Sequence, residues 1–291
     1  MKRKEHEPMH KYTTWQIGGP ADLILQPESI AELLEALQEA KQIGKPYYII
    51  GAGSNLLVAD EGLRATVIAL GGSLCHWQID GTTITAEAGL PLPVLARKAA
   101  RAGLSGLEFA AGIPGSVGGA VVMNAGAYHS QMSNIVEQVL CCDRDGNLIK
   151  LDKEDCRFAY RNSRFKQDPS LIVLSVTLRL QPGDAAMIEK QMGNNTAARI
   201  EKQPTSYPYA GSVFKNPVGD AAGRLIEQIG AKGWKQGGAM VSEKHANFIV
   251  NTGAATCEDV LLLIDRIKKK VYEDFKIDLE EEILLLGKEN L

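Results

Sequence analysis

Two glycine-rich, uncharged segments carry the clearest chemical signal in this chain. They are GAGSNLL at Gly51–Leu57 and AAGIPGSVGGAVVMNAG at Ala110–Gly126. Because glycine has no Cβ, loops of this kind let backbone N–H groups approach a ligand closely. Successive amides then form a concavity that binds anions, and a phosphate is its natural guest. Neither segment contains a lysine, so we expect neutral amides of both loops to hold the diphosphate of a dinucleotide.

The common phosphate-binding and hydrolase motifs do not fit these segments. GAGSNL has the first two glycines of a Rossmann fingerprint, but Asn55 and Leu56 stand where the third glycine belongs. The ribose-binding acid expected about 20 residues later is also missing. A Walker loop would need a Lys-Ser/Thr pair after its last glycine. Ser116 is not in a nucleophile elbow, because Pro114 replaces the first glycine of that motif.

With these loops, several further segments resemble the UDP-N-acetylenolpyruvoylglucosamine reductases of peptidoglycan synthesis. Each segment alone is a weak signal, but all of them follow the order of the family along the whole chain. They are YTTWQIGGPAD (12–22), FAYRNSRFK (158–166), RIEKQP (199–204), YAGSVFKNP (209–217), KHANFIVN (244–251) and LEEEILLLG (279–287).

The resemblance implies an α+β fold. It has an FAD-binding domain of the vanillyl-alcohol-oxidase/p-cresol-methylhydroxylase type in two lobes, followed by a C-terminal α+β substrate domain. We expect lobe 1 at residues 1–71, joined by the C-terminal tail 280–291, lobe 2 at 72–185, and the substrate-binding domain at 186–279.

The implied activity is the NADPH-dependent, FAD-containing reduction of UDP-N-acetylglucosamine enolpyruvate to UDP-N-acetylmuramate. A hydride reaches the β-carbon of the enolpyruvyl ether, so negative charge collects on the α-carbon and its carboxylate until a proton arrives. By resemblance, Arg161 neutralises the carboxylate, Ser212 delivers the proton and Glu282 stabilises the enolate. Glu281 is the alternative to Glu282. The family often has proline where Glu281 stands, so a glutamate at 281 leaves it open which of the two matches the glutamate of the family.

The resemblance also implies non-covalent binding of FAD by the two loops and by Arg199. The residues concerned are Gly51, Ala52, Gly53, Ser54, Asn55, Leu56, Ala111, Gly112, Pro114, Gly115, Ser116, Gly118, Gly119, Asn124, Gly126 and Arg199. Lys202 and Asn216 are expected to bind the diphosphate of the UDP-sugar substrate. His245 is interpreted as a structural histidine and is not among the expected catalytic residues.

A short spacing distinguishes two forms of the family. Arg161 and Arg199 are only 38 positions apart (199 minus 161). The longer form has an inserted loop here, with a tyrosine that closes over bound substrate. This chain resembles the shorter form, which lacks that loop.

Composition excludes several classes of protein. The net charge of −3 argues against a nucleic-acid binder. Five cysteines occur without a CxxC pair, so we expect reduced thiols, no disulfide framework and no metal site. The charged N-terminus lacks the apolar core of a signal peptide, and no apolar run approaches the roughly 18 residues of a membrane span. We expect a cytoplasmic protein with no membrane, nucleic-acid or obligatory protein partner.

Local patterns predict the elements that position the candidate residues. Ser29 and Glu32 form a capping box before a helix that Gly44 ends. A strand at Tyr47–Ile50 leads into the first glycine-rich loop. Asp80-Gly81 predicts a hairpin with a type I′ turn, and Asp145-Gly146 predicts a second hairpin. Helices are expected at 92–102 and 186–202 and from Thr256 to about Phe275, where Thr256 and Asp259 form a cap.

Three alternatives stay open at this level. One is the FAD-carrying electron-transfer subunit of a molybdenum hydroxylase, and another is a catalytically silent protein that binds nucleotide sugars. The third is a pyridine-nucleotide dehydrogenase without flavin, which the incomplete Rossmann fingerprint disfavours. The segments around Ser212 and Glu282 favour the reductase.

Overall fold

The computed structural model describes residues 1–288 and contains two compact units. Unit 1 comprises Met1–Lys4, Leu23–Ala52 and Ala65–Arg199, and unit 2 comprises Glu5–Asp22, Gly53–Arg64 and the chain from Ile200 onward. The end of the predicted tail, 289–291, lies outside the described residues. The division into two lobes and a substrate domain stays a prediction.

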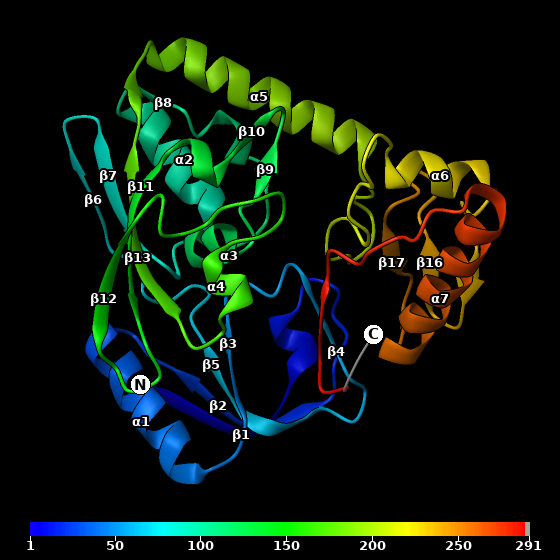
Figure 1. Ribbon diagram of the computed structural model, residues 1–291, viewed down its shortest axis with the longest axis horizontal. Helices are drawn as coiled ribbons and strands as arrows, with labels where there is room; N and C mark the ends of the chain where they lie inside the picture. Colours follow the sequence, from blue (N-terminus) through cyan, green and yellow to red (C-terminus); the bar gives the residue numbers. More distant parts are fainter. Residues whose placement is uncertain (289–291) are drawn as a thin grey trace. The chain divides into compact units, whose positions relative to one another are not determined.

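Unit 1 contains a five-stranded antiparallel sheet, which has the most strands of the described sheets (Figure 1). Its strands stand in the order β12-β11-β13-β7-β6, with bounds β6 Trp77–Asp80, β7 Thr83–Glu87, β11 Val136–Cys142, β12 Leu148–Asp152 and β13 Ile172–Arg179. Both predicted hairpins are present, as β6-β7 and β11-β12. The first turn differs in type, because its loop residues are Gly81 and Thr82 and only Gly81 has a positive φ. That pattern belongs to a type II′ turn, in which glycine takes the first central position.

A second sheet leads to the first glycine-rich loop. Its strands stand in the order β1-β2-β5-β3, with bounds β1 Lys2–Pro8, β2 Pro20–Gln26, β3 Tyr47–Ile50 and β5 Leu63–Ala69. Helix α1 (Ile30–Ile43) buries Leu33 and Leu37 in the same apolar cluster as Leu25 and Ile68. Ser29 caps the helix by accepting from the N–H of Glu32, and Gly44 ends it at φ 70°. The Glu32 carboxylate accepts from the N–H of Glu28, so the predicted capping box is only half formed.

The other elements of unit 1 are four helices and several short segments, and the last three residues of α5 already belong to unit 2. Their bounds are α2 Leu92–Arg101, α3 Val117–Val122, α4 Arg164–Gln167, α5 Ala185–Lys202, β8 Leu104–Ser105 paired with β14 Gln181–Pro182, β9 Gly126–Ala127 paired with β10 Ser130–Gln131, η2 Glu108–Ala110 and η3 Met132–Asn134. A single apolar cluster joins α1, α2 and α3 to both sheets. This packing holds the second glycine-rich segment, which runs through α3.

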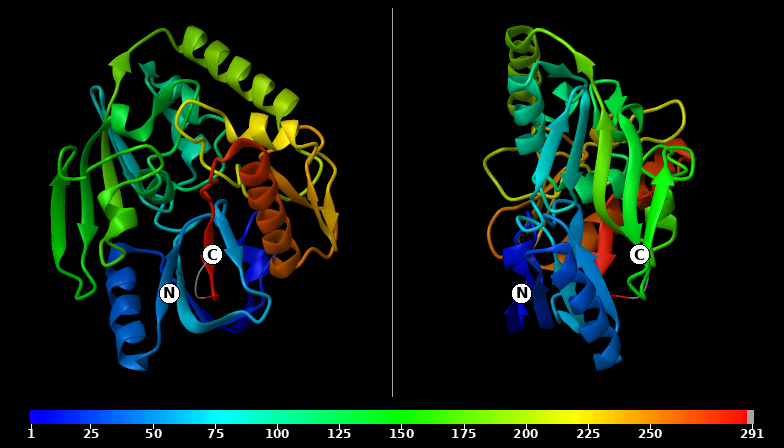
Figure 2. Two further views of the ribbon diagram at one scale, coloured as in Figure 1. Left: turned by 45° about the vertical axis from the view of Figure 1, so that its right-hand side comes forward. Right: turned by 90° about the vertical axis from the view of Figure 1, so that its left-hand side faces the viewer.

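Unit 2 has its own apolar core. A three-stranded sheet, β15 (Lys235–Gln236), β16 (Ala239–Val241) and β17 (Ile249–Asn251), lies beside the long helix α7 in Figure 2. Helix α7 (Cys257–Phe275) begins with the predicted capping box of Thr256 and Asp259. Strand β18 pairs in parallel with β4, and the bounds of the remaining elements are η1 Met9–Tyr12, β4 Leu56–Val58, α6 Ala222–Gln228 and β18 Leu284–Leu286.

Candidate active site

The first residue of the first glycine-rich segment, Gly51, contacts the second segment within unit 1. Strand β3 ends at Ile50, and a Cβ on the next residue, Gly51, would lie 2.3 Å from Oγ of Ser116. A Cβ on Gly71 would in turn lie 2.5 Å from the carbonyl oxygen of Gly51. No side chain fits at either glycine without moving its neighbours. Gly51 of the first predicted cofactor loop and Ser116 of the second are therefore direct neighbours.

Backbone amides at this place are available to a ligand. The N–H groups of Ala52, Gly115 and Ser116 donate no hydrogen bond within the part of the chain that the structure describes. Ser116 is buried, and its hydroxyl caps α3 by accepting from the N–H of Gly119 at 3.3 Å. Of these three residues only Ser116 is buried, and an unpaired N–H group is rare in a protein interior. Neutral donors from two glycine loops suit the diphosphate of a dinucleotide.

Other residues of these loops have structural roles that the sequence did not reveal. Asn124 is fully buried, and its side chain donates to the carbonyl of Ala159 and accepts from the N–H of Ser133, both at 2.9 Å. Asn55 donates through Nδ2 to the carbonyl of Glu282 at 3.0 Å. Gly53 passes so close to Tyr12 that a Cβ would lie 1.8 Å from its carbonyl oxygen. The cofactor contacts assigned to these residues stay predictions.

Arg161 lies beside the end of the second glycine-rich segment. Its Nη2 donates to the carbonyl of Gly126 at 3.1 Å, and its guanidinium lies 5.0 Å from the ring centre of Tyr160. The backbone of Arg161 has φ 52°, in a tight turn where Ala159 and Asn162 exchange hydrogen bonds. A non-glycine residue in this left-handed region costs on the order of 1 kcal/mol. This strained turn brings the Arg161 guanidinium within hydrogen-bond distance of the carbonyl of Gly126.

Arg199 also packs against the second segment. A Cβ on Gly112 would lie 2.9 Å from Cδ of Arg199, so this glycine gives room for the arginine stem. Arg199 is half-buried near the C-terminal end of α5. The structure thus brings together parts of both glycine-rich segments, Arg161 and Arg199 within unit 1.

Ser212 belongs to unit 2 and begins a segment that pairs with the C-terminal tail. The carbonyl of Val213 accepts from the N–H of Glu282 at 2.8 Å, and the N–H of Lys215 donates to the carbonyl of Glu280 at 2.8 Å. The half-buried Ser212 hydroxyl makes no hydrogen bond to any described residue. Ser212 and Glu282 are distant in sequence, but this backbone pairing holds their main chains close together in space.

The three adjacent glutamates differ in their surroundings. Glu280 is exposed and pairs with Lys215. Glu281 is 14% exposed and pairs with Nζ of Lys268 at 2.6 Å. Successive side chains of an extended segment point to opposite faces, so Glu282 faces away from this second ion pair. Glu280 and Glu281 thus both have a lysine partner on the protein surface.

The two predicted substrate residues lie in unit 2. Lys202 is exposed and has no ion-pair partner among residues 1–288. The Asn216 side chain accepts from the N–H of Ala222 at 3.1 Å, at the start of α6. Lys202 therefore keeps a free cation for a phosphate, while part of the Asn216 amide is used to begin a helix.

Two family profiles match the chain, one described as "FAD binding domain" over residues 21–152 and one as "UDP-N-acetylenolpyruvoylglucosamine reductase, C-terminal domain" over residues 203–286. The reductase of that name from Heliobacterium modesticaldum is 47% identical, over 97% of this chain and 90% of its own. The one from Clostridium botulinum (strain Okra) is 45% identical, over 98% of this chain and 92% of its own. The crystal structure of the Thermus caldophilus reductase matches with a TM-score of 0.83 and 40% identity, covering 98% of both chains.

The chain belongs to the UDP-N-acetylenolpyruvoylglucosamine reductase family.

Family membership confirms the main predictions from the sequence. The reductase has the predicted FAD-binding fold with a C-terminal substrate domain, and it is a flavin-dependent oxidoreductase of peptidoglycan synthesis that uses FAD and NADPH. It also has the length of the shorter form. The match over nearly the whole chain sets aside the molybdenum hydroxylase subunit and the flavin-free dehydrogenase.

The five cysteines and His245 of the reductase are wholly or partly buried. All five cysteines are free, and burial raises the pKa of Cys156 and Cys257 to about 12, which makes both thiols unreactive. His245 is half-buried, and burial lowers its pKa, with Lys232 acting in the same direction. Within residues 1–288, no three or more His, Cys, Asp and Glu side chains gather in a way that could hold a metal ion. Among the described helices, none combines the length and apolar character of a membrane span.

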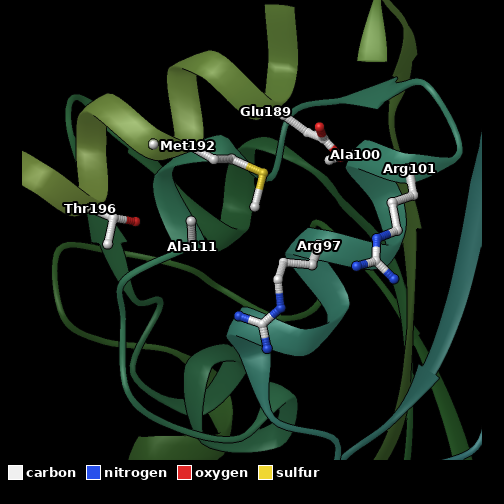
Figure 3. A pocket seen from close by; sticks show the side chains of 8 residues that line it. Arg97, Ala100, Arg101, Ala111, Glu189, Met192 and Thr196 are labelled. Atoms are coloured by element: carbon white, nitrogen blue, oxygen red, sulfur yellow. The ribbon is translucent and has the colours of Figure 1, made fainter. Parts of the chain in front are cut away.

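Unit 1 also contains a hollow of about 250 Å³ between α2 and α5, shown in Figure 3. Arg97 and Arg101 of α2 face Met192 and Thr196 of α5 across it. None of the predicted catalytic or substrate-binding residues lines this hollow.

Proposed function

We propose that Arg161, Ser212 and Glu282 perform the proton and charge chemistry of this reductase. FAD bound by the glycine-rich loops would supply the hydride chemistry, by which the β-carbon of the enolpyruvyl group is reduced at the expense of NADPH. The planar Arg161 guanidinium would bind the substrate carboxylate through two parallel hydrogen bonds and remain charged at any working pH. Its backbone turn and its bond to Gly126 fix the direction of the side chain.

Ser212 would supply the proton that completes the reduction. The O–H bond of Ser212 breaks as a new C–H bond forms at the substrate α-carbon, and the hydroxyl then regains a proton from water. Glu282 would stabilise the enolate as this charge develops. The observation that carries this proposal is the hydrogen bond between Glu282 and Val213, which fixes the backbone of the proposed donor beside that of the proposed stabilising carboxyl.

Glu282 is proposed in preference to Glu281 because of the ion pair with Lys268. A carboxylate paired with a lysine at 2.6 Å already has its charge compensated. A catalytic role for Glu281 would require this carboxylate to leave Lys268, whereas Glu282 lies on the other face of the extended segment.

The remaining predicted residues would bind the two nucleotides. The free amides of Ala52, Gly115 and Ser116 would hold the FAD diphosphate, with Arg199 on the flavin side. Lys202 and Asn216 would hold the UDP diphosphate by charge and by amide donation. We also propose that the reductase works in the cytoplasm without an obligatory protein partner, because NADPH and UDP-sugars are cytoplasmic metabolites.

The test is to follow the two halves of the reaction separately. The purified protein is reduced with NADPH under anaerobic conditions and then mixed with UDP-N-acetylglucosamine enolpyruvate. Loss and return of the oxidised flavin absorbance should occur in turn. Flavin that is reduced but not reoxidised by this substrate would contradict the proposal, and would favour a silent nucleotide-sugar binder.

A further inference from the structure

Asn247 is a buried amide whose side-chain bonds all fall on the backbone near Ser212. The residue is 4% exposed. Its Oδ1 accepts from the N–H of Phe214 at 2.9 Å, and its Nδ2 donates to the carbonyl of Phe214 at 2.8 Å. Its backbone carbonyl accepts from the N–H of Val213 at 2.9 Å. One residue therefore holds both positions that follow Ser212.

The C-terminal tail holds the same segment from another direction. The carbonyl of Val213 and the N–H of Lys215 bond to the backbone of Glu282 and Glu280. Between them, the N–H and the carbonyl of Phe214 bond to Asn247 instead. Phe214 thus bonds to Asn247 through both of its backbone groups, while the carbonyl before it and the N–H after it bond to the tail, as for a residue in a strand between two partners. The side chain of Asn247 takes the place of a third strand.

The donor and the acceptor of a carboxamide complement the two backbone groups of Phe214. Phe214 presents one backbone N–H and one carbonyl, and asparagine offers one group of each complementary kind. Leucine has nearly the same size but would leave both buried backbone groups without a partner. Aspartate would keep the acceptor and lose the donor. The residue type at position 247 therefore decides whether Phe214 is fully hydrogen-bonded.

His245 fixes Asn247 in its turn. The N–H of Asn247 donates to Nδ1 of His245 at 3.2 Å. The His245 ring makes an edge contact with Phe248, with ring centres 4.8 Å apart. An imidazole that accepts at Nδ1 carries its proton on Nε2 in the neutral form. The short segment from His245 to Phe248 is therefore a rigid support for the Asn247 side chain.

We propose that Asn247 is a positioning residue for proton delivery in this reductase. The inference rests on the proposed function, in which the Ser212 hydroxyl protonates the substrate α-carbon. Ser212 follows Gly211, which has φ 76° and adds freedom on the N-terminal side of the serine. On the C-terminal side of the serine, Asn247 restricts the backbone by its hydrogen bonds to Val213 and Phe214. Misplacement of a reacting group by about 1 Å can cost on the order of 10²-fold in rate.

The experiment compares Asn247→Leu with wild type in both half-reactions. We expect flavin reduction by NADPH to stay within about twofold, and reoxidation by the enolpyruvyl substrate to slow by roughly 10- to 100-fold. We also expect a larger solvent deuterium isotope effect on reoxidation, because proton transfer becomes the slowest step. A change that only lowers the amount of folded enzyme would leave this isotope effect unchanged.

Asn251 offers a matched control in the same unit. It is 7% exposed, donates to the carbonyl of Trp15 at 3.0 Å and accepts from the N–H groups of Gly253 and Ala255. Within residues 1–288, its side chain makes no hydrogen bond to the segment that follows Ser212. Asn251→Leu should lower stability as Asn247→Leu does, while leaving the rate and the isotope effect of reoxidation near those of wild type. If both variants slow reoxidation equally, the inference is wrong.

A double variant separates this inference from the proposed function. If Asn247 acts through Ser212, adding Asn247→Leu to Ser212→Ala should slow reoxidation no further. A Ser212→Ala enzyme with normal reoxidation would overturn the proposed proton donor itself. A slow Ser212→Ala enzyme beside a normal Asn247→Leu enzyme would overturn only the positioning role. If Asn247→Leu does not fold, Asn247→Asp keeps the acceptor for the Phe214 N–H, replaces the donor by a second carboxyl oxygen, and should also slow reoxidation without slowing flavin reduction.

Discussion

The N–H of Glu282 donates a 2.8 Å hydrogen bond to the carbonyl of Val213, the residue after Ser212. This bond joins the C-terminal tail to the loop that carries the proposed proton donor. Two residues with different proposed tasks are therefore held by one piece of antiparallel backbone. Any shift of the tail would move both of them together.

Ser212→Ala should separate the two half-reactions. Transfer of hydride from NADPH to the flavin requires no proton at the substrate α-carbon, so its rate should stay near that of wild type. Reoxidation by the enolpyruvyl substrate should slow by about 10²–10⁴-fold, which is typical for loss of a general acid. Stopped-flow absorbance of the flavin measures both rates. Ser206→Ala, at an exposed serine of the same unit, is the control, and equal slowing of both half-reactions would refute the role of Ser212.

Arg161→Lys should keep FAD but lose most of the turnover. An ammonium preserves the charge but cannot make two parallel hydrogen bonds to a carboxylate. We expect a loss of transition-state stabilisation of about 2–4 kcal/mol, as for removal of one oxyanion donor. The value follows from kcat/KM for the enolpyruvyl substrate. Arg164→Lys, in the adjacent helix α4, should have little effect, and near-normal turnover of the Arg161 variant would make that arginine a structural residue.

Glu282→Gln and Glu281→Gln should have different effects. The first change removes the carboxyl proposed to stabilise the enolate and should slow reoxidation by about 10²–10³-fold. The second removes the ion pair with Lys268, which is partly exposed and contributes about 0–1 kcal/mol to stability. Stopped-flow rates and thermal unfolding of both variants provide the comparison. A slow Glu281 variant beside a normal Glu282 variant would reverse the assignment.

Gly51→Ala should weaken FAD binding. The new Cβ would lie 2.3 Å from Oγ of Ser116, so the two glycine-rich segments would have to separate. We expect this variant to bind FAD at least tenfold more weakly, as measured by flavin fluorescence during titration of the apoprotein. In wild type, denaturation should release all of the FAD, because the cofactor is expected to be bound non-covalently. Gly193→Ala is the control, because its Cβ meets no atom within 4 Å. In helix α5 that change should stabilise the protein by roughly 0.5–1 kcal/mol.

Stability should fall on mild acidification because of His245. Burial is the main cause that lowers the pKa of this histidine below its ordinary 6.5. The folded protein thus resists a proton that the unfolded chain binds as the pH falls through about 6.5. The free energy of unfolding should be highest above that pH and decrease below it, down to the folded-state pKa. His245→Gln should flatten this decrease in urea titrations between about pH 7.5 and 5.5; an unchanged slope would show that His245 does not cause it.

Local sequence patterns were sufficient for many elements of this fold. Ser29 and Thr256 cap helices where predicted, and the strand at Tyr47–Ile50 has the predicted bounds. These features depend on backbone sterics and on hydrogen bonds between residues a few positions apart, so a short stretch of chain contains all the information. The predicted type of the turn after Asp80 was wrong. Asp80 pairs with Thr83 across the two strands, which makes Gly81 the first loop residue, and this register depends on both strands.

The sequence by itself determined the family, and with it the flavin cofactor and the reaction, because glycine-rich loops and ordered motifs are properties of the chain alone. Tertiary structure decided which neighbours these motifs have. That Gly51 needs to be glycine depends on Ser116, and the ion pair of Glu281 depends on Lys268. The segment KHANFIVN contains Asn247, but Phe214, to which its side chain bonds, lies 33 positions earlier in the sequence. Such contacts form only when the apolar core closes the intervening chain, and no local pattern encodes that closure.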